Sequence, residues 1–145
     1  MTARRVSRER LLQALYQFQL TGAWPDLADL RRRDEFAPAG GESEDEPFVQ
    51  RLLDALQQRL ADVDGLIEAA SRHWRLARMA AVDLSLIRLA TAELLLAVAP
   101  TAVVLNEAVE LAKLYGTDTS AVFVNGVLDG VVRQLAAAPG GAAAD

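Results

Sequence analysis

The stretch DLSLIRLATAELLLAV, residues 83–98, is apolar on nearly every side when it is drawn as a helix. Its apolar side chains fall into two groups on different faces, namely Ile87, Ala90 and Leu94, and Leu86, Leu89 and Leu96. A helix of this kind is stable only when other elements cover most of its surface. We therefore predict that residues 83–98 form the central element of the C-terminal half.

Two more helices are predicted after this central one. Pro100 ends the central helix, and Thr101 can cap the next helix, which Gly116 closes. The core face of that helix is predicted to comprise Val104, Leu105, Ala108, Leu111 and Ala112. Thr119 or Ser120 is expected to cap the last helix. The buried residues of the last helix are predicted to be Val124, Val127, Leu128, Val131 and Leu135.

The N-terminal half is also predicted to be helical. Ser7 is a good N-cap for the first helix, because its hydroxyl can accept a hydrogen bond from a free backbone N–H, and Gly22 ends that helix. A long third helix is expected to begin at Pro47 and to keep its apolar period to Ile67. Gly65 is the residue expected to loosen it.

A short second helix and a loop connect these two long helices. The short helix is predicted to open at Pro25 and to end near Phe36. Residues 37–46, APAGGESEDE, are rich in Gly and Pro, which favours a loop. The loop ends in an acidic cluster of Glu42, Glu44, Asp45 and Glu46. We interpret this cluster as part of a solvated linker.

The strand pattern is nearly absent, since no alternating β-branched run is bounded by turns. The sequence therefore predicts an all-α bundle of about seven helices. A length of 145 residues fits one compact domain or two tightly joined sub-bundles. Residues 137–145, which are rich in Gly and Ala, are expected to form a flexible tail.

The composition narrows the classes of function. Hydrophobic residues make up 52% of the chain, which is enough for a core. No apolar run approaches the ~20 residues that span a bilayer, so we expect a soluble, cytoplasmic protein without membrane contact. The absence of cysteine excludes disulfides and thiolate metal sites. The formal net charge of −5 means that any contact with nucleic acid must be local.

A search for catalytic chemistry finds almost nothing. His73 is the one histidine, and metal sites need several ligands together. Gly40 and Gly41 lie in an acidic stretch, which repels phosphate. We interpret the carboxylates on the helices as solvent-facing members of surface ion pairs. The sequence therefore predicts no catalytic residue, no metal site, no cofactor and no enzymatic activity.

Four arginines lie near the N-terminus, on the predicted arm before Ser7 and on the first turn of the helix that follows it. They are Arg4, Arg5, Arg8 and Arg10. Arginine pairs bidentately with phosphate and stacks on bases, so a basic end on an acidic protein can attract a polyanion. A merely solvated terminus is an equally good interpretation of the residues alone, because charge runs are common there.

The segment SAVFVNGVLDG, residues 120–130, is the second feature of interest. Phe123 falls about 90° from the centre of the apolar face. An aromatic side chain in such a position is either a platform for an unpaired base or a core residue. Asn125 and Asp129 lie on the far side and can form hydrogen bonds. Gly126 weakens the helix, which predicts a packing contact or a close approach there.

Several segments together resemble the NusB transcription antitermination family. They are RRVSRERLLQALYQFQLTG (4–22), LIRLATAELL (86–95), VVLNEAVELAKLYG (103–116) and FVNGVLD (123–129). They occur in the family's order and spacing, and the resemblance covers roughly residues 3–136. Residues 23–46 resemble the family least.

The resemblance implies an all-α fold with two packed sub-bundles, about residues 7–72 and 73–136, in one domain of residues 1–136. It implies binding to boxA, a short single-stranded RNA element, together with the small-subunit ribosomal protein called NusE. The pair takes part in the antitermination complex of RNA polymerase and promotes read-through in ribosomal-RNA transcription. The resemblance implies no cofactor and no catalysis.

The resemblance also implies positions for the functional residues. Those expected to bind RNA are Arg4, Arg5, Arg8, Tyr16, Lys113, Phe123, Asn125 and Asp129. Those expected near the protein partner are Asp83 and Arg88. The arm is shorter and less basic than in some members, so we expect weak RNA binding without the partner.

Two other functions and one assembly stay open at this point. The chain can be a helical module that binds proteins and no RNA. It can also be a fragment of an RNA cytosine methyltransferase, in which NusB-like domains occur, although no Gly-rich cofactor loop is present. A homodimer is the open assembly, because leucines of the central helix exceed the needs of one core. These leucines are Leu86, Leu89 and Leu96.

Overall fold

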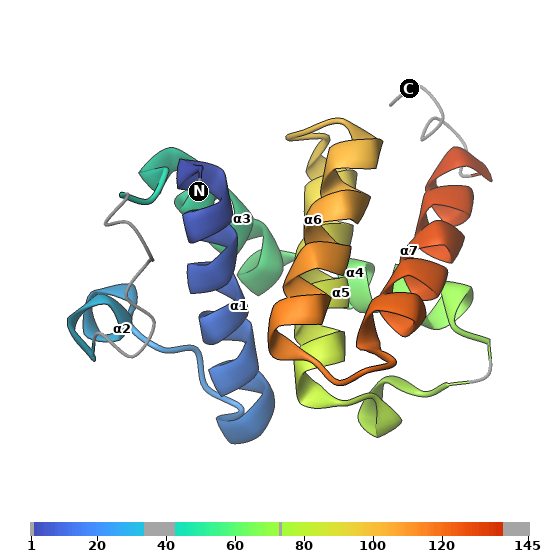
Figure 1. The fold of residues 1–145 in the computed structure, drawn as a ribbon, viewed down its shortest axis with the longest axis horizontal. Coiled ribbons are helices and arrows are strands. Elements are labelled where there is room, and N and C mark those ends of the chain that lie inside the picture. The colour runs from blue at the N-terminus through green and yellow to red at the C-terminus, as the bar shows by residue number, and fades with distance from the viewer. Residues whose placement is uncertain (1, 34–42, 73, 138–145) are drawn as a thin grey trace.

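The computed structural model describes residues 2–33, 43–72 and 74–137, and these residues contain seven α-helices and one short 3₁₀ helix (Figure 1). No strand occurs in these ranges, so the predicted all-α fold with about seven helices is confirmed. The elements are α1 (Ala3–Thr21), α2 (Leu27–Arg33), α3 (Glu46–Gln58), α4 (Leu60–Ala70), η1 (Leu76–Arg78), α5 (Ala81–Leu96), α6 (Thr101–Tyr115) and α7 (Ser120–Ala137).

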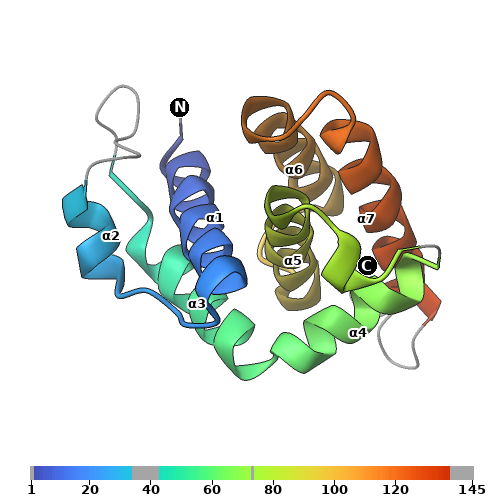
Figure 2. The same cartoon turned by 90° about the horizontal axis from the view of Figure 1, so that it is seen from below.

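Helix α5 is the central element, as its apolar sequence predicts. Every residue from Asp83 to Leu94 is buried, and the helix packs against α1, α3, α4, α6 and α7. Figure 2 shows α5 enclosed by its neighbours. Leu86 and Leu89 lie in this core, so the expectation that they are surplus and available for a self-interface is wrong. Leu96 is only partly buried.

The helices form two groups that α5 joins. Helices α1, α2 and α3 lie on one side, and α5, α6 and α7 lie on the other (Figure 2). Helix α4 passes beneath the second group and packs mainly against α7 and α5. The boundary between two sub-bundles near residue 72 stays a prediction, and α4, which lies before it, packs mainly against helices that follow it.

The crossing of α4 and α7 explains one glycine of the last helix. A Cβ atom on Gly130 would lie 2.9 Å from the Cβ of Ala70, which is closer than side chains tolerate. A Cβ on Gly126 would meet nothing within 4 Å. The close approach that the sequence analysis expected at Gly126 therefore occurs one helical turn later.

The first helix begins earlier than predicted. Thr2 is the N-cap, and its hydroxyl accepts a hydrogen bond from the backbone N–H of Arg5 (3.0 Å). Ser7 is buried inside the helix, where its hydroxyl donates to the carbonyl of Ala3 (2.7 Å). Arg4 and Arg5 consequently lie on the first helical turn, and the predicted free arm is wrong.

The predicted long third helix is two helices. Asp45 caps α3 by accepting from the N–H of Phe48 (3.2 Å), and Arg59 leaves the helical conformation with φ −122° and ψ 27°. The break therefore lies at Arg59 and not at Gly65. Thr101 is the first residue of α6 and makes no side-chain cap, which also differs from the prediction.

Some predictions fall outside the described residues. These concern Phe36 as the end of the second helix, His73, Glu42 and residues 138–145 of the expected tail. Ala137, the first residue of that expected tail, is the last residue of α7. Within the described ranges, none of the helices has the length and apolarity that a membrane span requires.

Candidate RNA-binding surface

Arg5 is tied to α6 by two parallel hydrogen bonds. Its Nε donates to Oε1 of Glu107 (2.6 Å), and its Nη2 donates to Oε2 of the same carboxylate (2.7 Å). The hydrogen bond with Glu107 raises the pKa of Arg5, and the same bond lowers the pKa of Glu107 below its ordinary value. This forked geometry is the one that arginine also offers to a phosphate.

Arg8 is buried in an ion pair with Glu93 of α5. Its Nε and Nη2 donate to the two carboxylate oxygens at 2.9 and 2.7 Å, and both side chains are at most 4% exposed. Its Nη1 also donates to Glu107 (3.5 Å). The interpretation of the helix carboxylates as solvent-facing is therefore wrong at Glu93, which the sequence analysis did not single out.

Arg10 and Arg31 share one carboxylate from the predicted linker. Arg10 Nε donates to Oε2 of Glu44 (2.8 Å), and Arg31 Nη2 donates to Oε1 (2.8 Å). Burial, the largest single influence, raises the pKa of Glu44, but the hydrogen bonds from Arg31 and Arg10 together lower it below its usual value. Glu44 is thus an anchor for α1 and α2, and the description of this cluster as solvated linker is wrong for it.

Arg4 is the most exposed of the α1 arginines that the resemblance singles out. Its side chain is 44% exposed, and its Nη1 donates to the carbonyl of Val98 (2.8 Å). Its guanidinium carbon lies 4.5 Å from the ring centre of Phe48, and its Nε lies 3.6 Å from Oδ2 of Asp45. Arg4 can therefore reach a ligand without breaking a buried ion pair.

Tyr16 and Lys113 are the other expected RNA-binding residues on α1 and α6, and Tyr115 joins these two helices. Tyr16 on α1 is 40% exposed. Lys113 is exposed on α6 and donates to Glu110 (3.2 Å). The hydroxyl of Tyr115 donates to Glu9, so a second polar contact joins α6 to α1 beside that of Arg5. Burial, together with this hydrogen bond, raises the pKa of Tyr115 to about 12.

Phe123 and Asp83 line the same groove, although the resemblance assigns one to RNA and the other to a protein partner. The groove has a volume of about 550 Å³, and Trp74, Arg78 and Val122 also line it. The ring of Phe123 is half-buried and meets Trp74 edge to face, with 5.9 Å between ring centres. Oδ1 of Asp83 is buried without a hydrogen-bond partner among the described residues.

Arg88, the other predicted partner residue, is held inside the protein. Its Nε and Nη2 donate to the two oxygens of Asp64 (both 2.9 Å), and its Nη1 donates to Gln19 (2.9 Å). It therefore joins α5 to α4 and α1. Its buried position allows it to support a binding surface rather than to form one.

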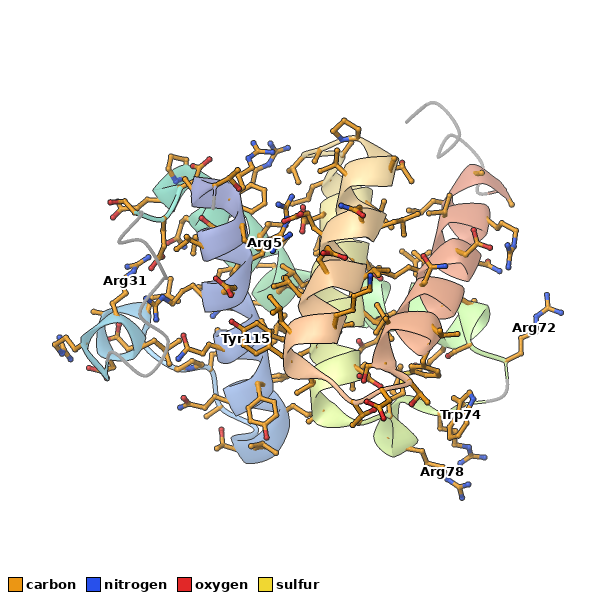
Figure 3. All side chains as sticks on the ribbon, in the orientation of Figure 1. Arg5, Arg31, Arg72, Trp74, Arg78 and Tyr115 are labelled. Carbon is orange, nitrogen blue, oxygen red and sulfur yellow. The ribbon has the colours of Figure 1, made fainter. Side chains whose placement is uncertain are left out.

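The remaining two predicted residues lie on the outer face of α7. Asn125 is exposed, and Asp129 accepts a hydrogen bond from Arg133 (2.5 Å). The structure thus separates the predicted residues into one region around α1 and α6 and another around α7. Figure 3 shows Arg5 between α1 and α6, and Trp74 apart from it at the lower right.

Metal binding has no candidate in the part of the chain that the structure describes. No group of three or more His, Asp or Glu side chains there is arranged to hold a metal ion.

Comparison with known proteins assigns the chain to a family. Residues 5–133 match the family model described as "NusB family". The chain belongs to the NusB family. This confirms the resemblance that rests on the α1, α5, α6 and α7 segments.

Curated relatives match over nearly the whole chain. The transcription antitermination protein NusB of Anaeromyxobacter dehalogenans (strain 2CP-1) is 46% identical over 136 residues, covering 93% of this chain and 94% of the relative. The protein of the same name from Desulfitobacterium hafniense (strain DCB-2) is 40% identical, with 92% and 90% covered.

Solved structures of the NusB family share the fold. NusB of T. maritima superposes with a TM-score of 0.75 at 33% identity, covering 92% of each chain. A chain from a crystal structure of the antitermination factors NusB and NusE with double-stranded RNA has a TM-score of 0.74 at 25% identity. It covers 92% of this chain and 98% of that one.

Proposed function

We propose that this protein is a cytoplasmic transcription antitermination factor without catalytic activity. It binds single-stranded boxA RNA together with a NusE-type small-subunit ribosomal protein and acts in the antitermination complex of RNA polymerase. The observation that carries the proposal is the 46% identity, over 93% of the chain, to a protein named as such a factor. The similar structure that contains NusB, NusE and RNA supports the two partners.

The RNA surface is proposed to begin at the first turn of α1. Arg4 has an exposed side chain and that of Arg5 is partly exposed, and Tyr16 offers an aromatic ring further along the helix. Arg8 has a different role, since its buried pair with Glu93 fixes α1 on α5. We expect Arg8 to position the surface, while Arg4 and Arg5 contact phosphates.

The protein partner is proposed to contact the groove around Asp83. Its walls are largely apolar, and they include Asp83, whose buried Oδ1 has no hydrogen-bond partner among the described residues and whose carboxylate attracts a cationic side chain placed in the groove. A buried carboxylate without such a partner is costly, so a donor from outside stabilises it. A basic ribosomal protein supplies that chemistry.

The first experiment is a titration of labelled boxA RNA at two salt concentrations, with and without the NusE-type partner. We expect weak binding by the protein alone and tighter binding with the partner. The logarithm of the binding constant should fall by about 0.7 for each phosphate contact when the salt concentration rises tenfold. The Arg4→Ala, Arg5→Ala variant should lose affinity and salt dependence. An Arg59→Ala variant controls for the loss of an exposed arginine, since Arg59 lies far along the chain at the end of α3.

The alternative function is a helical module that binds proteins only. The engagement of Arg5 and Arg8 by carboxylates is the observation that favours it. Binding of the partner without any binding of RNA would establish this alternative and refute ours. The proposal of a non-enzyme is tested separately, and binding of a methyl donor would contradict it.

A further inference from the structure

Three arginines at the junction between α4 and α5 are exposed. They are Arg72, Arg75 and Arg78. None of their guanidinium groups forms a hydrogen bond or an ion pair with a residue that the structure describes. The arginines of α1 all have such partners. The positive charge at the junction is therefore less compensated by carboxylates than the positive charge of α1.

An exposed tryptophan lies among these three arginines. The side chain of Trp74 is 53% exposed, which is unusual for the largest apolar side chain. Its contact with Phe123, at 5.9 Å and 82° between ring planes, holds the indole against α7. Exposed aromatic rings of this kind serve as stacking platforms for unpaired bases.

A groove of about 820 Å³ runs along the arginine side of Trp74. Its lining includes all three junction arginines, and Glu68 is its one carboxylate among the described residues. Figure 3 shows Arg72, Trp74 and Arg78 projecting outward from the same corner of the molecule. Positive charge therefore gathers locally beside an aromatic ring, on a protein whose formal net charge is −5.

We propose that Trp74, together with Arg72, Arg75 and Arg78, is a second binding site for single-stranded RNA, remote from the α1 surface. A base stacks on the indole, and the neighbouring phosphates pair with the guanidinium groups. The combination favours RNA because an acidic peptide would use the arginines but has no base for the ring. The inference rests on the proposed function in one respect, which is that the polynucleotide the protein meets is RNA.

The site can be observed directly through tryptophan fluorescence. The chain has two tryptophans, and Trp24 is stacked on Phe18 near the end of α1, with 4.3 Å between ring centres. A Trp24→Phe variant keeps an aromatic ring there and leaves Trp74 as the single emitter. Titration with a uridine dodecamer should then quench the emission in a saturable and salt-dependent way. Unchanged emission at saturating RNA would overturn the proposal.

Substitutions test the base and the phosphate contacts separately. Trp74→Ala should weaken binding of the dodecamer about tenfold, the factor that corresponds to 1.4 kcal/mol of stacking, whereas Trp74→Phe should retain most of the affinity. Replacement of all three junction arginines by alanine should weaken the salt dependence, so that the plot of log K against log salt becomes shallower by about 2. The matched control replaces three exposed arginines elsewhere, Arg32, Arg51 and Arg59, and removes the same charge.

Three outcomes separate this proposal from the proposed function. If Arg4→Ala, Arg5→Ala weakens boxA binding to the level of the dodecamer while the dodecamer still quenches Trp74, both sites exist. If boxA binds the unmodified protein no more tightly than the dodecamer does, and Trp74→Ala weakens both alike, only the junction site stands. If an oligoglutamate quenches Trp74 as strongly as RNA does, or if the control triple variant loses as much as the junction variant, the RNA site at Trp74 is refuted.

Discussion

The arginines of α1 and those of the α4–α5 junction are the same residue type in opposite surroundings. Arg5, Arg8 and Arg10 each donate to a carboxylate from a segment distant in the chain, whereas Arg72 and Arg75 have no ion-pair partner among the described residues. The first group holds helices together, and the second is free to meet a ligand. A run of basic residues therefore does not by itself identify the basic surface of a protein.

The largest expected effect comes from removing Arg8. The Arg8→Ala variant leaves the carboxylate of Glu93 buried without its partner, which should lower the free energy of unfolding by about 3–5 kcal/mol. Denaturant unfolding at neutral pH measures this loss. The double variant Arg8→Met, Glu93→Leu should recover most of it, because apolar residues of similar size can replace a buried pair. A loss below about 1 kcal/mol would mean that Arg8, like the junction arginines, contributes little to the stability of the fold.

Acid should weaken the paired region next. The pKa values of Glu107 and Glu44 are lowered in the folded protein, so each stabilises it fully above the unfolded pKa of ~4.3. That stabilisation is lost as the pH falls through the lower, folded pKa. Unfolding measured from pH 7 to pH 3 should therefore show a steeper decline for the unmodified protein than for the Glu44→Gln, Glu107→Gln variant. Parallel curves would contradict the assignment.

Release of Arg5 tests whether pairing limits RNA binding. In the Glu107→Gln variant the charge that competes with phosphate is gone, and the affinity for boxA RNA should rise about two- to fivefold, the range of a partly exposed ion pair. Fluorescence anisotropy at fixed salt measures the change. Reduced affinity would show instead that Glu107 orients Arg5 toward the RNA.

The smallest expected effect is on stability at the junction. Arg75→Ala should change the free energy of unfolding by no more than about 0.5 kcal/mol, because its exposed side chain has no partner to lose among the described residues. The same unfolding assay provides the value. A loss comparable to that of Arg8→Ala would end the distinction between the two regions.

Local sequence patterns predicted the helices well where the pattern was strong. Residues 83–98 were expected to form a buried central helix, and α5 is buried from Asp83 to Leu94. The segments that carry the family resemblance also lie almost entirely within the matched residues 5–133. Apolar periodicity depends on neighbours along the chain, which is why the sequence alone was sufficient for this part.

The sequence could not predict partners that the fold brings together. Glu93 meets Arg8 across 85 positions of the chain, and nothing local to either residue marks the pair. The break between α3 and α4 at Arg59 has neither glycine nor proline, so the sequence pattern does not predict it. Ser7 and Thr2 are both good cap residues, and the choice between them depends on how deeply α1 packs.

Trp74 forms part of the wall of both grooves at the junction. Any molecule that fixes the indole from one side bears the entropy cost of ordering it, and a second molecule on the other side then binds to a ring that is already ordered. The proposed RNA strand and the proposed protein partner should therefore strengthen each other's binding by the same factor, whichever arrives first. One side chain in a shared wall is enough to make two occupants interdependent.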